Sequence, residues 1–420
     1  MNAAPLLHVR PLAMPETGVG PVCRRIGMAA LTGAVFLAPY LAWRPFEIMF
    51  TASDALFCIA ALFLGLARAV PARPLGALTP LWLLSFVIMA SGLLLGSIVN
   101  GEPMRWAIAA AQYGFALIVL PFLLIGHGAR RTHALARTML AGIVAMEVFG
   151  IAVYFLSSGT FEDHQRLGLE FISGSRRLGV FMMDANWNGA FIAMSLPFVF
   201  YLHSKNELRG WQALIAGAIL VEGLLLAASV SATACAILSV FAMIMVGGRR
   251  VSIWPLLIGL GGIIAYLAAG GPLPQAFSTR IAPAIDTGNI AAAGTFSGRL
   301  GLIEEAWGMV GDTMLVGLGV DQYRVVAASG APVHNMYLLL WAEGGLIALI
   351  GWIMMLAILI AAALLVYKRD RMTSALALSV VTALVVSSTA SPHMYARLWM
   401  VPVMMAMAFV FEHAVRGKRP

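Results

Sequence analysis

Long runs of apolar residues alternate with short polar segments along most of the 420-residue chain. A helix needs about 20 mostly apolar residues to cross a bilayer. By that criterion the pattern predicts twelve spanning helices, some of them short, at 26–43, 55–69, 78–98, 106–126, 135–156, 187–203, 211–229, 232–246, 252–270, 347–366, 374–390 and 397–415. We therefore expect an all-α integral membrane protein.

Two predicted loops, at about 157–187 and 271–335, are long enough to form a functional site. The second loop precedes the tenth span. The predicted organisation is a cytoplasmic N-terminus at 1–25, nine spans within 26–270, a large periplasmic loop at 271–335, three spans within 336–415 and a cytoplasmic tail at 416–420.

The longer loop contains the stretch SGRLGLIEEAWGMVGD, from Ser297 to Asp312. Its large apolar residues recur at helical spacing: Leu300, Ile303, Trp307 and Val310. This periodicity predicts a helix that lies at the membrane surface.

Composition and charge agree with a membrane protein. Hydrophobic residues make up 61% of the chain and charged residues only 11%, which lies outside the usual range of soluble domains. The net charge of +8 is not arranged as a basic stripe, so we expect no nucleic-acid partner. One set of alternate loops holds 18 of the 27 Lys and Arg residues, including every lysine. Because cations accumulate on the cytoplasmic side, both termini are predicted to be cytoplasmic.

The cations of the predicted outer loops are all arginines. Arginine presents a planar fork of donors that suits phosphate or diphosphate, whereas lysine is a point charge. Pairing with neighbouring acids or with lipid headgroups is an equally good explanation for any one of them. Arg176 and Arg177 are the strongest candidates, because they precede a predicted helix whose start also carries Asp184, Asn186 and Asn188.

His334 and Asn335 stand at the start of the apolar stretch HNMYLLLWAEGGLIALIG. Histidine suits proton transfer near neutral pH. A simpler interpretation makes Asn335 the N-cap of a helix and His334 a polar residue at the membrane surface. The pair alone does not decide between these interpretations.

Three segments together resemble the bacterial O-antigen ligase and polysaccharide polymerase superfamily. They are RRLGVFMMDANWNGAFIAMSLP, SGRLGLIEEAWGMVGDTMLVGLGVDQY and HNMYLLLWAEGGLIALIG. The order, the spacing and the twelve-helix plan also fit. The chain departs from the family pattern at Asp184-Ala185-Asn186, where Asn-Pro-Asn is frequent, and at Val320-Asp321-Gln322-Tyr323, which replaces a turn richer in glycine.

The resemblance implies glycan transfer on the periplasmic face, from an undecaprenyl-diphosphate-linked donor to a sugar hydroxyl. It makes His334 the general base or the residue that positions the acceptor. It assigns Arg177 and Arg299 to the diphosphate, with Arg176, Arg324, Arg397 and Asn335 as further binding candidates. No metal or cofactor is implied, and the sequence has no Asp-x-Asp motif or clustered His and Cys ligands.

Several functions remain open at this point. A polymerase that extends the lipid-linked glycan is slightly favoured over a ligase that moves the finished glycan to lipid A-core. The location would be the bacterial inner membrane, with membrane lipid around the spans and a flippase or a chain-length regulator as protein partners. A transporter of polysaccharide or lipid-linked glycan is a third hypothesis, because Glu147 and Glu222 lie within predicted spans.

Overall fold

The computed structural model describes residues 20–42, 50–156, 172–173, 176–251, 296–312, 314–328, 330–392 and 396–416, with a few isolated positions between 252 and 295. The first half contains α1 (Gly20–Phe36), α2 (Ala52–Leu66), η1 (Gly76–Leu78), α3 (Thr79–Val99), α4 (Pro103–Gly114), the π-helical η2 (Phe115–Val119), α5 (Leu120–Leu124), α6 (Ala129–Leu156), β1 (Ile172–Ser173), β2 (Arg177–Leu178) and η3 (Val180–Met182). The second half contains α8 (Ala185–Ser204), α9 (Gly210–Ala227), α10 (Val230–Gly247), η4 (Gly248–Arg250), α14 (Phe296–Asp312), α15 (Tyr323–Val326), α16 (Met336–Val366), α17 (Arg371–Ser388) and α18 (Arg397–Arg416).

Most of the predicted spans coincide with helices. Within the described part of the chain, seven helical segments are long and apolar enough to cross a membrane: Gly76–Val99, Pro103–Leu124, Ala129–Leu156, Gly210–Ala227, Val230–Gly247, Met336–Val366 and Arg371–Ser388. Helices α1 and α2 have only 17 and 15 residues. The predicted span at 252–270 and most of the predicted loop at 271–335 before α14 lie outside the described residues. The described residues have the helical fold expected of a membrane protein. The predicted number of twelve spans is not confirmed.

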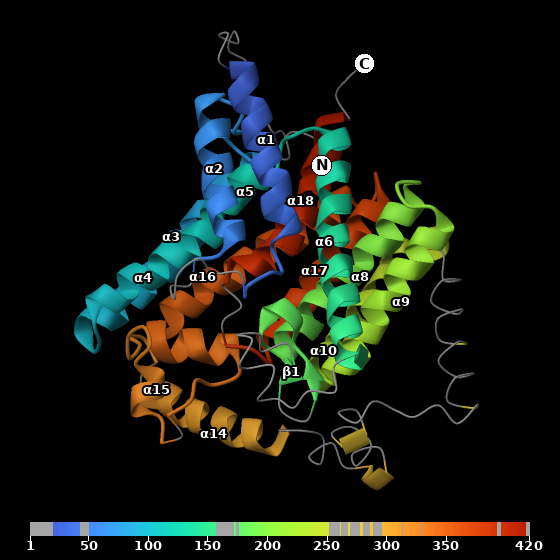
Figure 1. The fold of residues 1–420 in the computed structure, drawn as a ribbon. Coiled ribbons are helices and arrows are strands. Elements are labelled where there is room, and N and C mark those ends of the chain that lie inside the picture. The colour runs from blue at the N-terminus through green and yellow to red at the C-terminus, as the bar shows by residue number, and fades with distance from the viewer. Residues whose placement is uncertain are drawn as a thin grey trace.

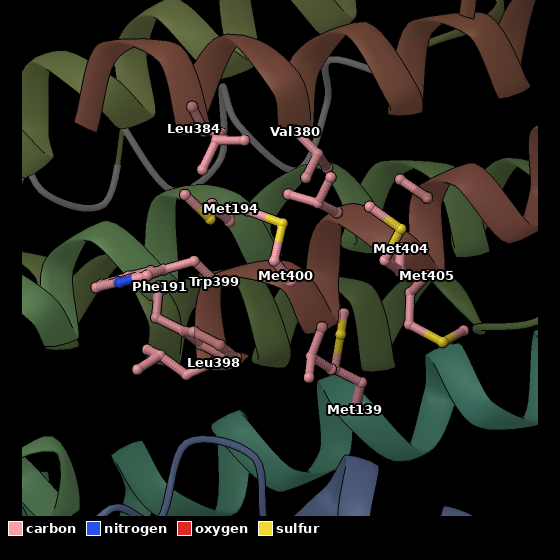
Figure 2. Close-up of a cluster of buried hydrophobic side chains, with 14 of the residues drawn as sticks. Met139, Phe191, Met194, Val380, Leu384, Leu398, Trp399, Met400, Met404 and Met405 are labelled. Atoms are coloured by element: carbon pink, nitrogen blue, oxygen red, sulfur yellow. The ribbon is translucent and has the colours of Figure 1, made fainter. Parts of the chain in front are cut away.

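Helix α18 forms the centre of the bundle. Its side chains are buried on all sides from Leu398 to Phe411, and it packs against α5, α6, α8, α16 and α17. Figure 2 shows methionines of α18 among side chains of α6, α8 and α17: Met139, Met194, Val380, Leu384, Met400, Met404 and Met405. Flexible methionine side chains fill irregular gaps between helices. A helix that is apolar all round is a core helix.

The bundle has two distinct ends. Arg24 of α1 and Arg131 of α6 both act electrostatically on His127, and the backbone N–H of Gly128 donates to the carboxylate of Glu412 in α18 at 2.6 Å. These contacts bring the starts of α1 and α6 and the end of α18 together. We call this the basic end. The β1–β2 hairpin, α14 and α15 lie at the opposite end, here called the hairpin end (Figure 1).

Helix α16 begins at Met336 and not at the predicted residue 347, and it is broken inside. Gly345 has φ +66°, which interrupts the helical hydrogen bonds around it. The carbonyls of Ala342 and Glu343 instead accept from Leu318 and Gly319, each at 2.8 Å. The prediction began too late because Glu343 and the two glycines interrupt the apolar run. A half-helix therefore precedes the long span.

Chain segment 314–319 makes the break in α16 possible. The N–H of Leu346 donates to the carbonyl of Met314 at 3.0 Å, and the side-chain amide of Asn100, the C-cap of α3, donates to the carbonyl of Gly317 at 3.0 Å. A side chain on Gly345 would collide with the carbonyl of Leu315. Because every backbone group freed at the break needs a partner at membrane depth, this segment fixes the half-helix in place.

Candidate functional site

Arg177 lies in the hairpin, where Ile172 pairs with Leu178 and Ser173 with Arg177. Its side chain is 8% exposed. Its Nε donates to the carbonyl of Ala227 at 2.9 Å, and its Nη2 donates to Oδ1 of Asn186 at 2.8 Å. The guanidinium therefore joins the hairpin to the end of α9 and to the first turn of α8.

The start of α8 is organised by the Asp184 carboxylate. Its Oδ1 accepts from the backbone N–H groups of Asn186 at 2.7 Å and Trp187 at 2.9 Å, as an N-cap does. The side-chain oxygen of Asn186 also accepts from the Ser229 hydroxyl at 2.9 Å. The Asp-Ala-Asn sequence thus provides a cap and, two residues later, an acceptor for Arg177.

Asn335 is the N-cap of α16. Its Oδ1 accepts from the backbone N–H groups of Tyr337 at 3.0 Å and Leu338 at 3.1 Å. The Tyr337 hydroxyl donates to the carbonyl of Val385 in α17 at 3.1 Å. The capping role that the sequence suggested for Asn335 is confirmed, and it fixes the backbone directly after His334.

The helix that the sequence predicted at 297–312 is confirmed as α14. Its Ala306 and Val310 are buried against Leu338, Leu339 and Ala342 of the α16 half-helix. Of the expected apolar face, Ile303 and Val310 join this packing, whereas Leu300 and Trp307 stay exposed. This contact places the first turn of α14, which carries Arg299, beside the start of α16.

His334 is half-buried just before α16 and interacts with two charged groups. The pKa of its imidazole lies below the ordinary value, first because of burial and then because of the positive charge of Arg299, while the negative charge of Asp184 acts in the opposite direction. At neutral pH the imidazole is therefore mostly neutral and able to accept a proton. The charges of Asp184 and Arg299, which belong to two other segments, thus act on His334 at the hairpin end.

The remaining predicted arginines contact other parts of the protein. Arg176 is exposed; its Nη2 donates to the carbonyl of Tyr154 at 2.9 Å, and its guanidinium lies over the Tyr154 ring. Arg324 is paired with Asp321 at 3.6 Å. Arg397 pairs with Asp54, at the start of α2.

A small cavity lies where α8, α10, α17 and α18 meet near the hairpin end. Its volume is about 20 Å³, which is room for roughly one water molecule. The lining residues are Asn186, Trp187, Ala190, Ser231, Ala232, Ser387, Ala390, Ser391 and Trp399. The indole Nε1 of Trp399 and the hydroxyl of Ser391 are buried without a hydrogen-bond partner.

The sequence analysis did not single out this cavity. Its two tryptophans come from helices far apart in the chain, and their rings lie 5.9 Å apart between centroids. A tryptophan near the end of a span is typical of membrane interfaces, so Trp187 and Trp399 carried no distinguishing signal. Only the packing of α18 against α8 brings them beside Asn186.

No group of three His, Cys, Asp or Glu side chains in the described part of the chain is placed to hold a metal ion. Searches against protein-family models and against curated proteins found no match to this chain.

Proposed function

We propose that the chain is a membrane glycosyltransferase that acts on an undecaprenyl-diphosphate-linked glycan and transfers it to a sugar hydroxyl. The observation that supports this most is that the charges of Arg299 and Asp184 both act on His334 at the hairpin end. A neutral imidazole beside a guanidinium combines a proton acceptor with a group that favours diphosphate. The resemblance of all three motifs points to the same reaction.

The proposed reaction is a direct displacement at the anomeric carbon of the donor. The acceptor oxygen forms the new glycosidic bond while the bond from the anomeric carbon to the diphosphate oxygen breaks. His334 takes the proton of the acceptor hydroxyl. Arg299 stabilises the negative charge that develops on the departing lipid diphosphate. The activated lipid supplies the energy, so the reaction needs no nucleotide.

Arg177 has a different proposed role within the same site. Two of its donors already bind Ala227 and Asn186, so we assign it to positioning the start of α8. Asp184, which caps that helix, then lies correctly beside His334. The diphosphate is assigned first to Arg299, which is only partly buried on α14.

We place the protein in the bacterial inner membrane with the hairpin end on the periplasmic side and both termini in the cytoplasm. The contacts at the basic end support this orientation, because Arg24, near the start of α1, and Arg131, in the first turn of α6, belong to the set of cations that the positive-inside rule assigns to the cytoplasm. A lipid-linked donor would then reach His334 from the outer leaflet.

A polymerase is our preferred form of this activity. A transporter is less well supported, because transporters use backbone groups freed at a helix break to hold their cargo. In α16 the carbonyls of Ala342 and Glu343 already bind segment 314–319. No corresponding glycine break interrupts another helix among the described spans.

The glycan phenotype of a deletion strain separates the alternatives. Loss of a polymerase should leave single repeat units on the lipid carrier, and loss of a ligase should leave lipid-linked polymer. Complementation with the wild-type gene is the control. Normal surface glycan and no accumulated lipid-linked intermediate in the deletion strain would contradict both forms of the proposal.

A further inference from the structure

Glu147 is a carboxylic acid enclosed within the bundle. It lies on α6, one of the helices long and apolar enough to span a membrane, and its side chain has no exposed surface. Gly223 of α9 faces it so closely that a side chain there would collide with the carboxyl group. Ionisable groups at such positions are costly, and they commonly have a function.

The polar groups around Glu147 include too few donors. No described residue forms a hydrogen bond of ordinary length and angle with either oxygen of Glu147, and Oδ1 of Asn188 also lacks such a partner. Asn188, on α8, is the polar side chain that lies against the carboxyl group. One hydrogen of its amide is directed to the carbonyl of Leu178 in the hairpin, with 3.3 Å between nitrogen and oxygen.

No compensating positive charge was found for Glu147. Among the described residues, no Lys, Arg or His forms an ion pair with it. The titratable group that faces it is Tyr40, after α1, whose hydroxyl donates instead to the carbonyl of Gly142 at 3.1 Å. The residues of α8 and α9 that lie against Glu147 are Asn188 and Gly223, and both are neutral. Burying an unpaired carboxylate is strongly unfavourable.

A proton on Glu147 removes both problems. It eliminates the buried charge, and it turns one of the acceptor oxygens into a donor. We propose that Glu147 binds one proton and donates it in a hydrogen bond to Oδ1 of Asn188. This completes a chain of hydrogen bonds from α6 through Asn188 to the carbonyl of Leu178.

This chain of hydrogen bonds ends at Leu178, next to Arg177, which pairs with Ser173 in the hairpin. Glu147 is thereby a proton-binding and positioning residue, which holds the hairpin against α6 and α8. Gly150, one turn farther along α6, packs against Val180 directly after the hairpin. The site does not depend on glycan transfer, since it concerns only the protonation of a buried side chain.

Infrared spectroscopy of the full-length protein in detergent tests the protonation directly. The spectrum of the wild type minus that of Glu147→Gln at neutral pH should contain the carbonyl stretch of a neutral carboxylic acid. Glu222→Gln, which removes the other acid predicted within a span, is the matched control and should leave that band in place. A difference spectrum that contains only carboxylate bands would overturn the proposal.

The partner is tested by Asn188→Leu, which keeps Glu147 unchanged. Loss of the acceptor should shift the carbonyl stretch of Glu147 to higher frequency, and an unshifted band would exclude Asn188 as its partner. Melting temperatures provide a second readout that is independent of activity. Glu147→Gln keeps a donor and should melt close to the wild type, whereas Glu147→Leu should melt several degrees lower. Equal melting of these two variants would contradict the hydrogen-bond chain.

Discussion

Arg177 and Arg299 come from motifs that imply the same role, yet the structure places them in different environments. Arg177 is 8% exposed and binds Ala227 and Asn186 through two of its nitrogens. Arg299 is only partly buried on α14, and its charge acts on His334. The comparison teaches that arginines from similar motifs can differ in role: Arg177 holds the protein together, and Arg299 is proposed to bind a ligand. The buried guanidinium of Arg177 indicates the first role, and the position of Arg299 near His334 is the basis of our proposal for the second.

The largest effect is expected at His334, beside Arg299. If its imidazole accepts the proton of the acceptor hydroxyl, His334→Ala should lower the transfer rate by on the order of 10²–10⁴. Glycan transfer by membranes with matched protein amounts is the measurement. His203→Ala, at the opposite end of the bundle, is the control and should keep its activity. A His334→Ala rate equal to the wild type would remove His334 from the chemistry.

The next effect separates the two arginines. Arg177→Lys loses at least one hydrogen bond of the buried guanidinium and should lower the free energy of unfolding by about 1–3 kcal/mol. Its transfer activity should fall along with this stability. Arg299→Lys keeps the charge but loses the planar fork, so its activity should fall, with a smaller loss of stability than in Arg177→Lys because Arg299 is only partly buried. Thermal unfolding of both variants in detergent, measured alongside transfer, makes the test. If Arg177→Lys and Arg299→Lys had the same free energy of unfolding, the structural role that we assign to Arg177 alone would be wrong.

A smaller effect is expected in the pH dependence of transfer. Because burial and Arg299 hold the pKa of His334 below its ordinary value, the basic form persists to lower pH. Transfer by the wild type should therefore decline only below about pH 6.5, the ordinary histidine value. Arg299→Gln removes the repulsion, raises the pKa of His334 and should move this decline to higher pH. The remaining activity of this variant is measured from acidic to neutral pH. If the pH at which transfer declines did not change, Arg299 would not influence the pKa of His334.

The smallest effect is expected at Asn335. Its side chain accepts from two N–H groups at the start of α16, so Asn335→Ala should lower the stability by about 1 kcal/mol. Part of the transfer activity should remain, because capping is a structural role. Asn335→Asp retains the acceptor and should restore the stability. Complete loss of transfer in a stably folded Asn335→Asp variant would instead place the Asn335 amide against substrate.

Local sequence patterns predicted the local parts of this structure. The periodicity around Ile303 and Val310 gave α14, and the position of Asn335 gave the cap of α16. The break at Gly345 was not predicted, because it depends on hydrogen bonds from residues 314–319, far away in the sequence. The partners of Arg177 and the cavity beside Trp399 were missed for the same physical reason. They arise only when α8, α9 and α18 pack together.

The central claim is that His334 and Arg299 form the centre of a glycan-transfer site. The most direct test uses purified protein in liposomes with undecaprenyl-diphosphate-linked repeat units and no nucleotide. The wild type should join the units into longer lipid-linked glycans and release undecaprenyl diphosphate, while His334→Ala and Arg299→Lys at equal amounts should do so far more slowly. Wild-type protein that releases no undecaprenyl diphosphate from this donor with either a repeat-unit or a lipid A-core acceptor would contradict the account.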